Sequence, residues 1–445
     1  MMVRVRFAPS PTGALHIGNA RAAVLCWLYA HKHNGQFMLR IDDTDRERST
    51  DAFADAIMED VAWLGLKHDL FAKQSDRFDR YEEVKQQLIA DGRLYPCYET
   101  PEELDFKRKR QLAKGEPPIY DRAALLLTEE DRARYEAEGR TPHWRFKLVP
   151  GKISWNDHIR GPVEFSTDNL GDQVLIRGDG MFLYTLASVT DDIDFNITHI
   201  VRGEDHVTNT ALQIQLFEAI TNKPCTVEFA HFTMFLDKGG QALSKRLGSL
   251  SLKSMRDKGL EPMTICSLLA RLGTSMPIEP VLSLDELAKN FEFSIFSRTA
   301  PHFDDHELDV LNHKLLTHMP YTMVKDRLPA EINETLWLLV RGNLESIADA
   351  NAWKCIFSDA LFVTPPEEKE YIADALALLP LTPWDEATWS LWTNALKEKT
   401  ARKGRALFMP LRQVLTGFDH GPEMKDLLPL IGYDRAFARL KKAAE

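Results

Sequence analysis

The sequence lacks the features of a membrane protein or an exported protein. Its longest unbroken apolar run, residues 22–30, has nine residues, whereas a membrane-spanning helix needs ~20. Residues 1–6 alternate arginine with valine after the two methionines and contain no apolar signal core. We therefore expect no export and no membrane partner, and we expect a cytoplasmic protein.

Cysteine is also scarce. The chain has five cysteines, and no two of them lie within the short spacing of a metal-binding clip. An odd number of scattered cysteines is not typical of a disulfide framework or of a structural zinc site, and it fits a reducing compartment. They stand at positions 26, 97, 225, 266 and 355.

An excess of positive charge is absent as well. Lysine and arginine number 55 against 66 aspartates and glutamates, which gives a net charge of −11. We therefore expect a nucleic acid to bind only through local basic patches. The composition, 44% hydrophobic and 27% charged, is ordinary for a globular protein and excludes a wholly disordered, collagen-like or coiled-coil chain. At ~150 residues per domain, this length predicts roughly three domains.

The first part of the chain has the pattern of a strand–helix–strand unit. Residues 3–8 alternate like a strand. A helix is predicted from Gly18 to a C-cap signal near residue 34, and residues 37–41 are predicted as the second strand. Residues 46–95 show the apolar spacing of helices.

The composition changes after residue 95. Residues 96–182 combine charged helical stretches with short strands such as residues 144–149, which indicates an inserted domain. Apolar strand-and-helix character returns with residues 183–189 and continues to a strand predicted at residues 229–236. Beyond residue 300 only helical periodicity is visible, so we expect an all-α C-terminal region.

A strand end, a tight turn and a helix start follow one another in residues 10–19, Ser-Pro-Thr-Gly-Ala-Leu-His-Ile-Gly-Asn. Free N–H groups and the helix dipole make such a helix start a place for an anion. Gly18 lets a ligand approach the backbone because it has no Cβ, and His16 and Asn19 can donate hydrogen bonds to phosphate. Taken alone, an ordinary loop histidine would be the simpler interpretation.

A second motif lies about 230 residues further along the chain. Lys245 and Arg246 follow Ser244 in a loop beside glycines, between a predicted strand and a helical stretch. Two adjacent cations on a loop can close over a triphosphate and neutralise the charge that grows as pyrophosphate leaves. A solvated basic turn is the alternative for this motif alone, and the two motifs together favour a nucleotide site.

The two motifs resemble the signatures of class I aminoacyl-tRNA synthetases. Residues 16–19, His-Ile-Gly-Asn, are similar to the His-Ile-Gly-His signature, and residues 242–246, Ala-Leu-Ser-Lys-Arg, are similar to the Lys-Met-Ser-Lys-Ser loop. The segments 6–13, 39–45 and 201–206 resemble those of bacterial glutamyl-tRNA synthetases. This similarity covers essentially the whole chain.

The resemblance implies an α/β multidomain fold. A Rossmann-type catalytic domain would comprise residues 1–95 and 183–237, and an inserted α+β acceptor-stem-binding domain would comprise residues 96–182. A stem-contact region with the Ser-Lys-Arg loop would follow at residues 238–305. Residues 306–445 would form an all-α anticodon-binding region.

A glutamate pocket needs a fixed cation for the side-chain carboxylate. Arg6 lies at the carboxyl end of the first predicted strand, where open α/β sheets bind ligands, and a guanidinium can bind a carboxylate through two hydrogen bonds. From the residues alone, a surface arginine on an edge strand is an equal alternative. The resemblance implies that Arg6 and Arg202 contact the carboxylate and that Asp42 contacts the ammonium group. The further pocket residues that it implies are Ala8, Ser10, Tyr184 and Ser188.

The resemblance also implies ATP as a substrate, with Mg²⁺ arriving on the nucleotide rather than in a protein cage. The α-carboxylate of glutamate would attack the α-phosphorus, giving glutamyl-adenylate and pyrophosphate. A ribose hydroxyl of tRNA would then attack the activated carbonyl and release AMP, and bound tRNA would be needed for the first step. The implied catalytic residues are His16, Gly18, Asn19, Lys245 and Arg246, and the implied ATP contacts are His16, Gly18, Asp205, Leu236 and Lys245.

Four positions depart from the family pattern. Asp42 stands where Glu is usual, is one methylene shorter, and matches the glutaminyl relatives. Ala242 replaces the first lysine of the loop signature, so one phosphate contact is missing. Asn19 replaces the second histidine and can still donate a hydrogen bond. Cys97 stands alone where some relatives hold zinc with a Cys/His set, so we predict no zinc and no other protein metal site.

Local basic clusters are the candidate RNA contacts. Residues 107–110 lie in the insertion, where a solvated helix face is an equal alternative. Asn343 falls near a position where discriminating relatives use Arg to reject one anticodon base, which leaves a relaxed specificity open. The expected partners are tRNA(Glu), tRNA(Gln) or both, and the relatives imply a monomer. The better cluster, near the C-terminus, includes Lys399, Arg402, Lys403 and Arg405.

Three other functions remain open at this level. A glutaminyl-tRNA synthetase is favoured by Asp42, but those relatives carry β-barrels where this chain shows helical periodicity. A nucleotidyltransferase with the same His-x-Gly fold is usually far smaller and leaves the last third of the chain unexplained. An inactive paralogue that only binds tRNA is kept open by Ala242.

Overall fold

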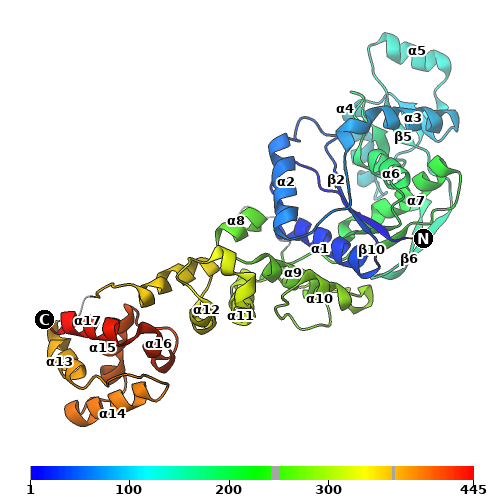
Figure 1. Ribbon diagram of the computed structural model, residues 1–445. Helices are drawn as coiled ribbons and strands as arrows, with labels where there is room; N and C mark the ends of the chain where they lie inside the picture. The colour runs from blue at the N-terminus through cyan, green and yellow to red at the C-terminus, as the bar shows by residue number, and fades with distance from the viewer. Residues whose placement is uncertain (1, 242–249, 363–365) are drawn as a thin grey trace. The chain divides into compact units, whose positions relative to one another are not determined.

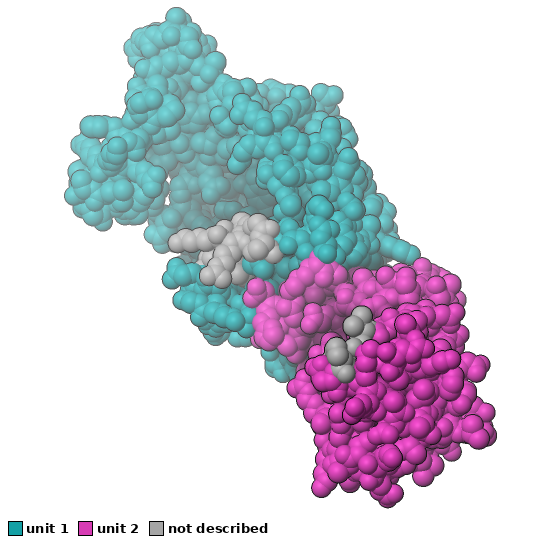
Figure 2. Space-filling view, turned by 90° about the vertical axis from the view of Figure 1, so that its left-hand side faces the viewer, with its two compact units in different colours: residues 1–257, 265–304 teal, residues 258–264, 305–445 magenta. Residues whose placement is uncertain are grey.

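The computed structural model describes residues 2–241, 250–362 and 366–445. The chain divides into two compact units, coloured teal and magenta in Figure 2. Unit 1 comprises residues 1–257 and 265–304, and unit 2 comprises residues 258–264 and 305–445. The predictions for Ala242, Lys245 and Arg246 lie outside the described residues.

The centre of unit 1 is a mixed sheet with the strand order β3-β2-β1-β9-β10-β6-β7 (Figure 1). All neighbouring strands in it run parallel except β7, which pairs antiparallel with β6. The chain passes from β1 to β2 on one side, and β9 lies on the other side of β1, which creates a switch point where such sheets bind ligands. The strands are β1 Arg4–Phe7, β2 Gln36–Ile41, β3 Leu70–Lys73, β6 Lys152–Asp157, β7 Gly161–Ser166, β9 His199–Gly203 and β10 Glu228–Phe232.

Helices cover the sheet and bury its apolar strands. Helices α3, α6 and α7 share one apolar core with Met38, Ile200 and Phe229 of the sheet. Helix α1 packs against β1, β2 and β9, and it also contacts α10. The helices of unit 1 are α1 Ile17–Lys32, α2 Asp51–Trp63, α3 Phe78–Ala90, α4 Pro101–Ala113, α5 Glu129–Ala137, α6 Tyr184–Asp194, α7 Val207–Thr221, α8 Leu252–Asp257 and α10 Leu284–Lys289, and α9 Pro262–Arg271 has residues in both units.

Part of the segment predicted as an insertion builds a small antiparallel sheet with the order β4-β5-β8, whereas β6 and β7 of the same segment belong to the seven-stranded sheet. Its strands are β4 Leu94–Cys97, β5 His143–Phe146 and β8 Val174–Ile176. Helix α4 begins with a capping box in which the Thr100 side chain accepts from the Glu103 amide and the Glu103 carboxylate accepts from the Thr100 amide. Two otherwise unpaired N–H groups are thereby satisfied, which places the start of this basic helix firmly.

Unit 2 contains helices and no strand among its described residues, as the periodicity predicts. Helix α17 packs against α13, α15 and α16. Its buried Arg439 donates to the backbone carbonyls of Leu415, Cys355 and Ser358 at 2.6, 2.7 and 2.7 Å. The helices are α11 Asp305–His318, α12 Glu334–Val340, α13 Lys369–Ala377, α14 Thr388–Thr400, α15 Arg405–Thr416, α16 Met424–Ile431 and α17 Tyr433–Ala444.

Short 3-10 helices connect the larger elements. They are Gln74–Arg77, Ala123–Leu126, Thr167–Asn169, Glu204–His206, Phe293–Ile295, Tyr321–Met323, Lys325–Arg327, Arg341–Asn343, Ile347–Phe357 and Pro366–Glu368. Among the described helices, none is both long and apolar enough to cross a membrane.

Some local predictions are wrong. Residues 46–95 are not uniformly helical, because residues 70–73 form β3, which pairs in parallel with β2. Four residues carry too little periodicity to reveal a strand whose pairing partner is distant in sequence. Residues 184–189 start helix α6 and contain no strand, and the strand predicted at residues 229–236 ends at Phe232.

Candidate functional site

A cavity of about 880 Å³ lies at the carboxyl ends of β1, β9 and β10. Its wall includes the turn after β1, the start of α1 and the end of β9. This is the edge at which open α/β sheets bind ligands. The predicted site residues that line it are Arg6, Ala8, Ser10, His16, Gly18, Asn19, Tyr184, Arg202 and Asp205, whereas Asp42, Ser188 and Leu236 do not.

His16 caps the first helix at this cavity. Its Nδ1 accepts from the backbone N–H groups of Gly18 at 3.1 Å and Asn19 at 3.4 Å, so the ring proton of the neutral form resides on Nε2. Burial lowers the pKa of His16, which favours that neutral form. A Cβ at Gly18 would lie 3.0 Å from Cε1 of His16, so any other residue would displace the imidazole by a few tenths of an ångström. No acidic residue occupies the first turn of α1, as an anion site requires.

Arg202 carries a buried positive charge whose contacts among the described residues are all neutral groups. Its side chain donates to Nε2 of His231 at 3.2 Å and to the Tyr184 hydroxyl at 3.1 Å. It also donates to Thr210 Oγ1 and Gln213 Oε1, each at 2.6 Å. The residue is 6% exposed, and burial lowers its pKa. A buried charge without an ionic partner is costly, so this guanidinium favours an anionic ligand in the cavity.

A relay of two residues sets the orientation of Arg202. The His231 ring accepts from Arg202 through Nε2, and its Nδ1 lies 2.5 Å from Asp157 Oδ2. The other carboxylate oxygen, Oδ1, accepts from the backbone N–H groups of Ile159, Arg160 and His231. Burial opposes ionisation, but these hydrogen bonds prevail and lower the pKa of Asp157 to about 2. The ionised carboxylate therefore keeps the ring proton of His231 on Nδ1.

Arg6, which is 4% exposed, is held from behind by one carboxylate. Its Nε lies 3.1 Å from Oδ1 of Asp192, and its Nη2 lies 3.3 Å from Oδ2. No described residue gives Nη1 of Arg6 a hydrogen-bond partner, and Arg6 lines the cavity. Burial alone would lower the pKa of Arg6, but Asp192 outweighs it and the pKa is raised. The guanidinium is thus charged, oriented and open to a second carboxylate.

Asp42 and Ser188 lie behind this layer, in contact with the fully buried Arg40. Nε of Arg40 is 2.6 Å from Oδ1 of Asp42, and its Nη2 is 3.1 Å from Oδ2. Arg40 also donates to Asp192 at 2.8 Å and to Ser188 at 3.0 Å. Burial raises the pKa of Asp42 to about 6, although Arg40 opposes this shift. The predicted contact of Asp42 with an ammonium group stays a prediction, and Arg40 is a partner that the sequence did not reveal.

The chain on the far side of residues 242–249 returns to the helix start. Ser251 forms an isolated bridge with His16, and the Leu252 amide donates to the Leu15 carbonyl at 2.9 Å. Ser251 itself lines the cavity. Leu236 lies outside the lining and donates its amide to the Pro301 carbonyl at 3.0 Å, so its ATP contact stays a prediction.

Comparison with known proteins decides the family. Residues 2–310 match the family model described as tRNA synthetases class I (E and Q), catalytic domain. Residues 351–444 match the model described as anticodon binding domain. The chain belongs to the class I tRNA synthetases of the E and Q group.

Similar synthetases cover the whole chain. It is 54% identical over 442 residues to glutamate–tRNA ligase 1 of Parvibaculum lavamentivorans, with 98% of each chain covered. It is 53% identical over 444 residues to glutamate–tRNA ligase 1 of Maricaulis maris, with 99% of each covered. The crystal structure of a glutamate tRNA ligase from Elizabethkingia meningosepticum in complex with its amino acid matches with a TM-score of 0.83 and 27% identity, covering 100% of this chain and 99% of that one.

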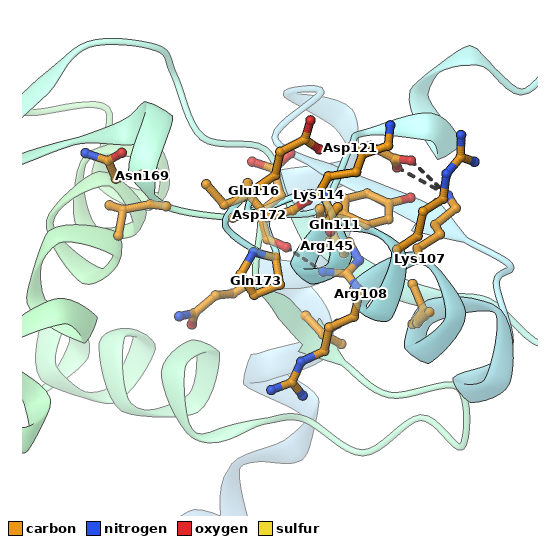
Figure 3. A pocket seen from close by; sticks show the side chains of 18 of the residues that line it. Lys107, Arg108, Gln111, Lys114, Glu116, Asp121, Arg145, Asn169, Asp172 and Gln173 are labelled. Atoms are coloured by element: carbon orange, nitrogen blue, oxygen red, sulfur yellow. Dashed lines mark hydrogen bonds and ion pairs between the residues drawn. The ribbon is translucent and has the colours of Figure 1, made fainter.

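The insertion of the synthetase carries a second cavity, of about 680 Å³, with a basic rim (Figure 3). Lys107 forms ion pairs with Glu99 at 3.3 Å and with Asp121 at 3.2 Å. Arg108, Arg110 and Lys114 also line this cavity; they are exposed, and none has an ion-pair partner among the described residues. The Lys-Arg-Lys-Arg run is therefore only partly neutralised by its own domain.

Cys97 does not stand alone in the structure. One ligand atom from each of Cys97, Glu99 and His143 lies within 4.8 Å of the others. Oε2 of Glu99 and Nε2 of His143 are buried and have no hydrogen-bond partner among the described residues. These donors fit a small metal ion. The absence of zinc stays a prediction. Its premise, that Cys97 has no other possible metal ligand beside it, is wrong. His143 is distant from Cys97 in the sequence, so the sequence did not indicate that the two lie together.

In the basic cluster of unit 2, some side chains are exposed to solvent and one is held in an ion pair. Lys399, Lys403 and Arg405 are exposed at the end of α14 and the start of α15. Arg402 instead forms an ion pair with Glu368 and lies 4.2 Å from the centre of the Tyr371 ring. Its RNA contact stays a prediction, as does that of the exposed Asn343.

The polar residues behind the cavity escaped the sequence-based reasoning. A weak signal existed for several of them, because each interrupts an apolar stretch. Arg40 stands between Leu39 and Ile41, and His231 stands between Ala230 and Phe232. A charged or polar residue inside a buried strand needs a partner, so such interruptions point to a network. The residues in question are Arg40, Asp157, Asp192, Thr210, Gln213 and His231.

Proposed function

We propose that this synthetase ligates glutamate to tRNA in an ATP-dependent reaction through a glutamyl-adenylate, releasing pyrophosphate and AMP. The observation that carries the proposal is the buried charge of Arg202, which among the described residues has only neutral acceptors, beside Nη1 of Arg6, for which the described part of the chain provides no partner. Both guanidinium groups line the cavity that contains the capped start of α1. A carboxylate and a phosphate ester can therefore bind in one cavity.

The amino-acid end of the cavity favours glutamate over glutamine. The carboxylate of glutamate would neutralise Arg202 and accept from both arginines. A neutral amide in the same place would leave buried positive charge unpaired and would turn an N–H₂ group toward other donors. Because an unpaired buried charge costs several kcal/mol, discrimination of ~10²-fold or more is expected from this contact alone.

The nucleotide end of the cavity offers the start of α1 and a neutral imidazole. His16 holds the first turn of α1 through Nδ1, and its Nε2–H is available to donate to a phosphate oxygen. Positioning and charge stabilisation suffice for the attack of a carboxylate on the α-phosphorus, because the reaction needs no protein nucleophile. Mg²⁺ would arrive with ATP and screen the phosphate charge. Lys245 and Arg246 remain the proposed phosphate contacts of the loop.

For tRNA we propose two contact regions, each described within its own unit. The exposed Arg108, Arg110 and Lys114 of the insertion are free to contact phosphates. The exposed Lys399, Lys403 and Arg405 offer the same chemistry in unit 2. tRNA(Glu) and tRNA(Gln) are both kept as candidate substrates, and the protein is expected to act as a cytoplasmic monomer.

The deciding experiment charges purified tRNA(Glu) and tRNA(Gln) separately with labelled glutamate, and again with labelled glutamine. We expect charging with glutamate, dependent on ATP and tRNA, together with AMP release. Charging of tRNA(Gln) with glutamate would identify the relaxed or tRNA(Gln)-directed specificity. Charging with glutamine, or tRNA binding without turnover, would refute the proposed activity in favour of a glutaminyl synthetase or an inactive paralogue.

A further inference from the structure

A group of possible metal ligands lies at the other end of the catalytic strands. His199 is the first residue of β9, Glu228 is the first residue of β10, and His158 follows the last residue of β6. These strands are neighbours in the sheet, in the order β9-β10-β6. The cavity lies at the opposite, carboxyl ends of β9 and β10. This group is therefore separate from the site described above.

The three side chains converge. Nε2 of His158 lies 2.7 Å from Oε2 of Glu228, and Nε2 of His199 lies 3.6 Å from the same oxygen. One ligand atom from each residue lies within 4.8 Å of the other two. A tetrahedral metal with bonds of ~2.0–2.1 Å separates its ligand atoms by ~3.4 Å. Small rotations of the solvent-accessible His158 and Glu228 side chains would bring the three atoms to that spacing.

The hydrogen bonds around His199 allow its Nε2 to be without a proton. The Thr198 hydroxyl accepts from the Arg4 amide at 2.8 Å and can donate its single proton to the Arg4 carbonyl at 3.2 Å. Its second lone pair then accepts from Nδ1 of His199 at 2.8 Å. In this arrangement the neutral imidazole carries its proton on Nδ1 and turns a bare Nε2 toward Glu228. Metal-binding histidines are held in this way, with the second nitrogen donating to a neighbouring group.

An ordinary ion pair explains only part of this arrangement. His158 and Glu228 satisfy one another, whereas Nε2 of His199 lies 3.6 Å from the Glu228 carboxylate, beyond hydrogen-bond distance. The ring is also enclosed by Tyr29, whose centroid lies 4.9 Å away. A cation between the three ligand atoms would satisfy both the lone pair and the carboxylate.

We propose that His158, His199 and Glu228 bind a divalent transition-metal cation of the zinc type. Two imidazole nitrogens and one carboxylate are donors that suit Zn²⁺, and the exposure of His158 and Glu228 leaves solvent room for a fourth ligand. This site departs from the sequence-based expectation that the protein holds no metal. Bound metal joins three neighbouring strands, and His158 is adjacent to Asp157, which orients His231 and Arg202.

The experiment titrates Zn²⁺ into the full-length chain at neutral pH and measures binding by calorimetry and thermal unfolding. All proteins carry Cys97→Ser, because the Cys97 cluster is a second candidate for zinc. We expect one Zn²⁺ per chain and a higher Tm in its presence. His158→Asn and Glu228→Gln, both at accessible positions, should weaken binding ~100-fold or more. Thr198→Val, which removes the partner of Nδ1, should weaken it by ~10–100-fold.

The control variant is His318→Asn, which removes an exposed imidazole from α11 in the other unit and should leave Zn²⁺ binding unchanged. Co²⁺ should give absorption bands without a thiolate charge-transfer band, as expected for nitrogen and oxygen ligands. The proposal is overturned if the Cys97→Ser chain takes up no Zn²⁺. It is also overturned by unchanged affinity in His158→Asn or Glu228→Gln. These measurements need neither tRNA nor turnover, so they are independent of the proposed ligase activity.

Discussion

Replacing Asp157 by asparagine should reverse the proton position on His231 and thereby loosen the glutamate pocket. Oδ1 of Asp157 accepts from three backbone N–H groups, of Ile159, Arg160 and His231. An asparagine must keep its oxygen at that position, which places its NH₂ group where Oδ2 now lies, 2.5 Å from Nδ1 of His231. Nδ1 would then have to accept, and the ring proton would move to Nε2.

The moved ring proton would remove a hydrogen bond of Arg202. Its Nε–H now donates to Nε2 of His231 at 3.2 Å, and in the variant two N–H groups would face each other. Loss of a hydrogen bond to a charged group costs ~1.5–3 kcal/mol. At about 2 kcal/mol, the KM for glutamate should rise ~30-fold, because 1.36 kcal/mol corresponds to a factor of ten.

The assay is steady-state charging of tRNA with labelled glutamate, with KM measured for each substrate. We expect the KM for glutamate to rise while the KM for ATP changes little. Asp172→Asn is the matched control, because Asp172 is also a buried carboxylate that accepts a backbone N–H, from Leu148 in the insertion. It should lower stability without raising the KM for glutamate.

A double-mutant cycle tests the relay directly. In a His231→Gln background the ring whose tautomer matters is absent, so Asp157→Asn should add little to the KM for glutamate. Full additivity of the two changes would refute the argument. So would an unchanged KM for glutamate in Asp157→Asn when circular dichroism shows a folded protein.

Four further predictions concern other parts of the site. Arg6→Ala should raise the KM for glutamate ~100-fold, because it removes one of two guanidinium groups from a buried carboxylate; an unchanged KM removes Arg6 from the pocket. His16→Asn keeps an N-cap, so it should leave the Tm within a few degrees, yet it should slow adenylate formation at least ~10-fold. If His16→Asn and His16→Ala lose equally in Tm and equally in the rate of adenylate formation, His16 has a capping role only. Because the pKa of Asp42 is raised to about 6, the KM for glutamate should rise as the pH falls through 6. In Asp42→Asn the KM for glutamate should show no such pH dependence. If the KM of this variant still rises as the pH falls through 6, the titrating group is not Asp42. Arg108→Gln with Lys114→Gln should weaken tRNA binding and reduce its salt slope by ~0.7–0.9 per lost phosphate contact, with the KM for glutamate unchanged; an unaltered slope would show that these side chains do not contact phosphate.

The local features of the site were predictable because they depend on neighbours in sequence. The strand end, the turn and the helix start of residues 4–19 appear as the sequence predicts, one residue earlier at the helix start. The imidazole of His16 caps this helix. From the sequence, His16 was expected only to donate a hydrogen bond to a phosphate oxygen. The resemblance to the glutamyl-tRNA synthetases and the helical C-terminal region are confirmed by the family models and by the fold.

The electrostatic partners were not predictable in the same way. Asp192 lies in the last turn of α6, and its neighbours in sequence do not indicate that it contacts both Arg6 and Arg40. The same holds for Asp157, which reaches His231 across two neighbouring strands. Ion pairs between residues separated by more than 70 positions depend on strand order, and strand order follows from packing of the whole unit.

The sequence alone therefore determined the family and the helical class of the C-terminal region, because these are encoded in short segments and in periodicity. Only the tertiary structure decided which charges are neutralised and which stay open. It gave Arg6 a carboxylate behind it and, within the described ranges, gave Arg202 none; it also placed His143 beside Cys97 and His158 beside His199. The physical reason is that burial makes each charge depend on its few contacting atoms, and those atoms come from segments that only the folded chain brings together.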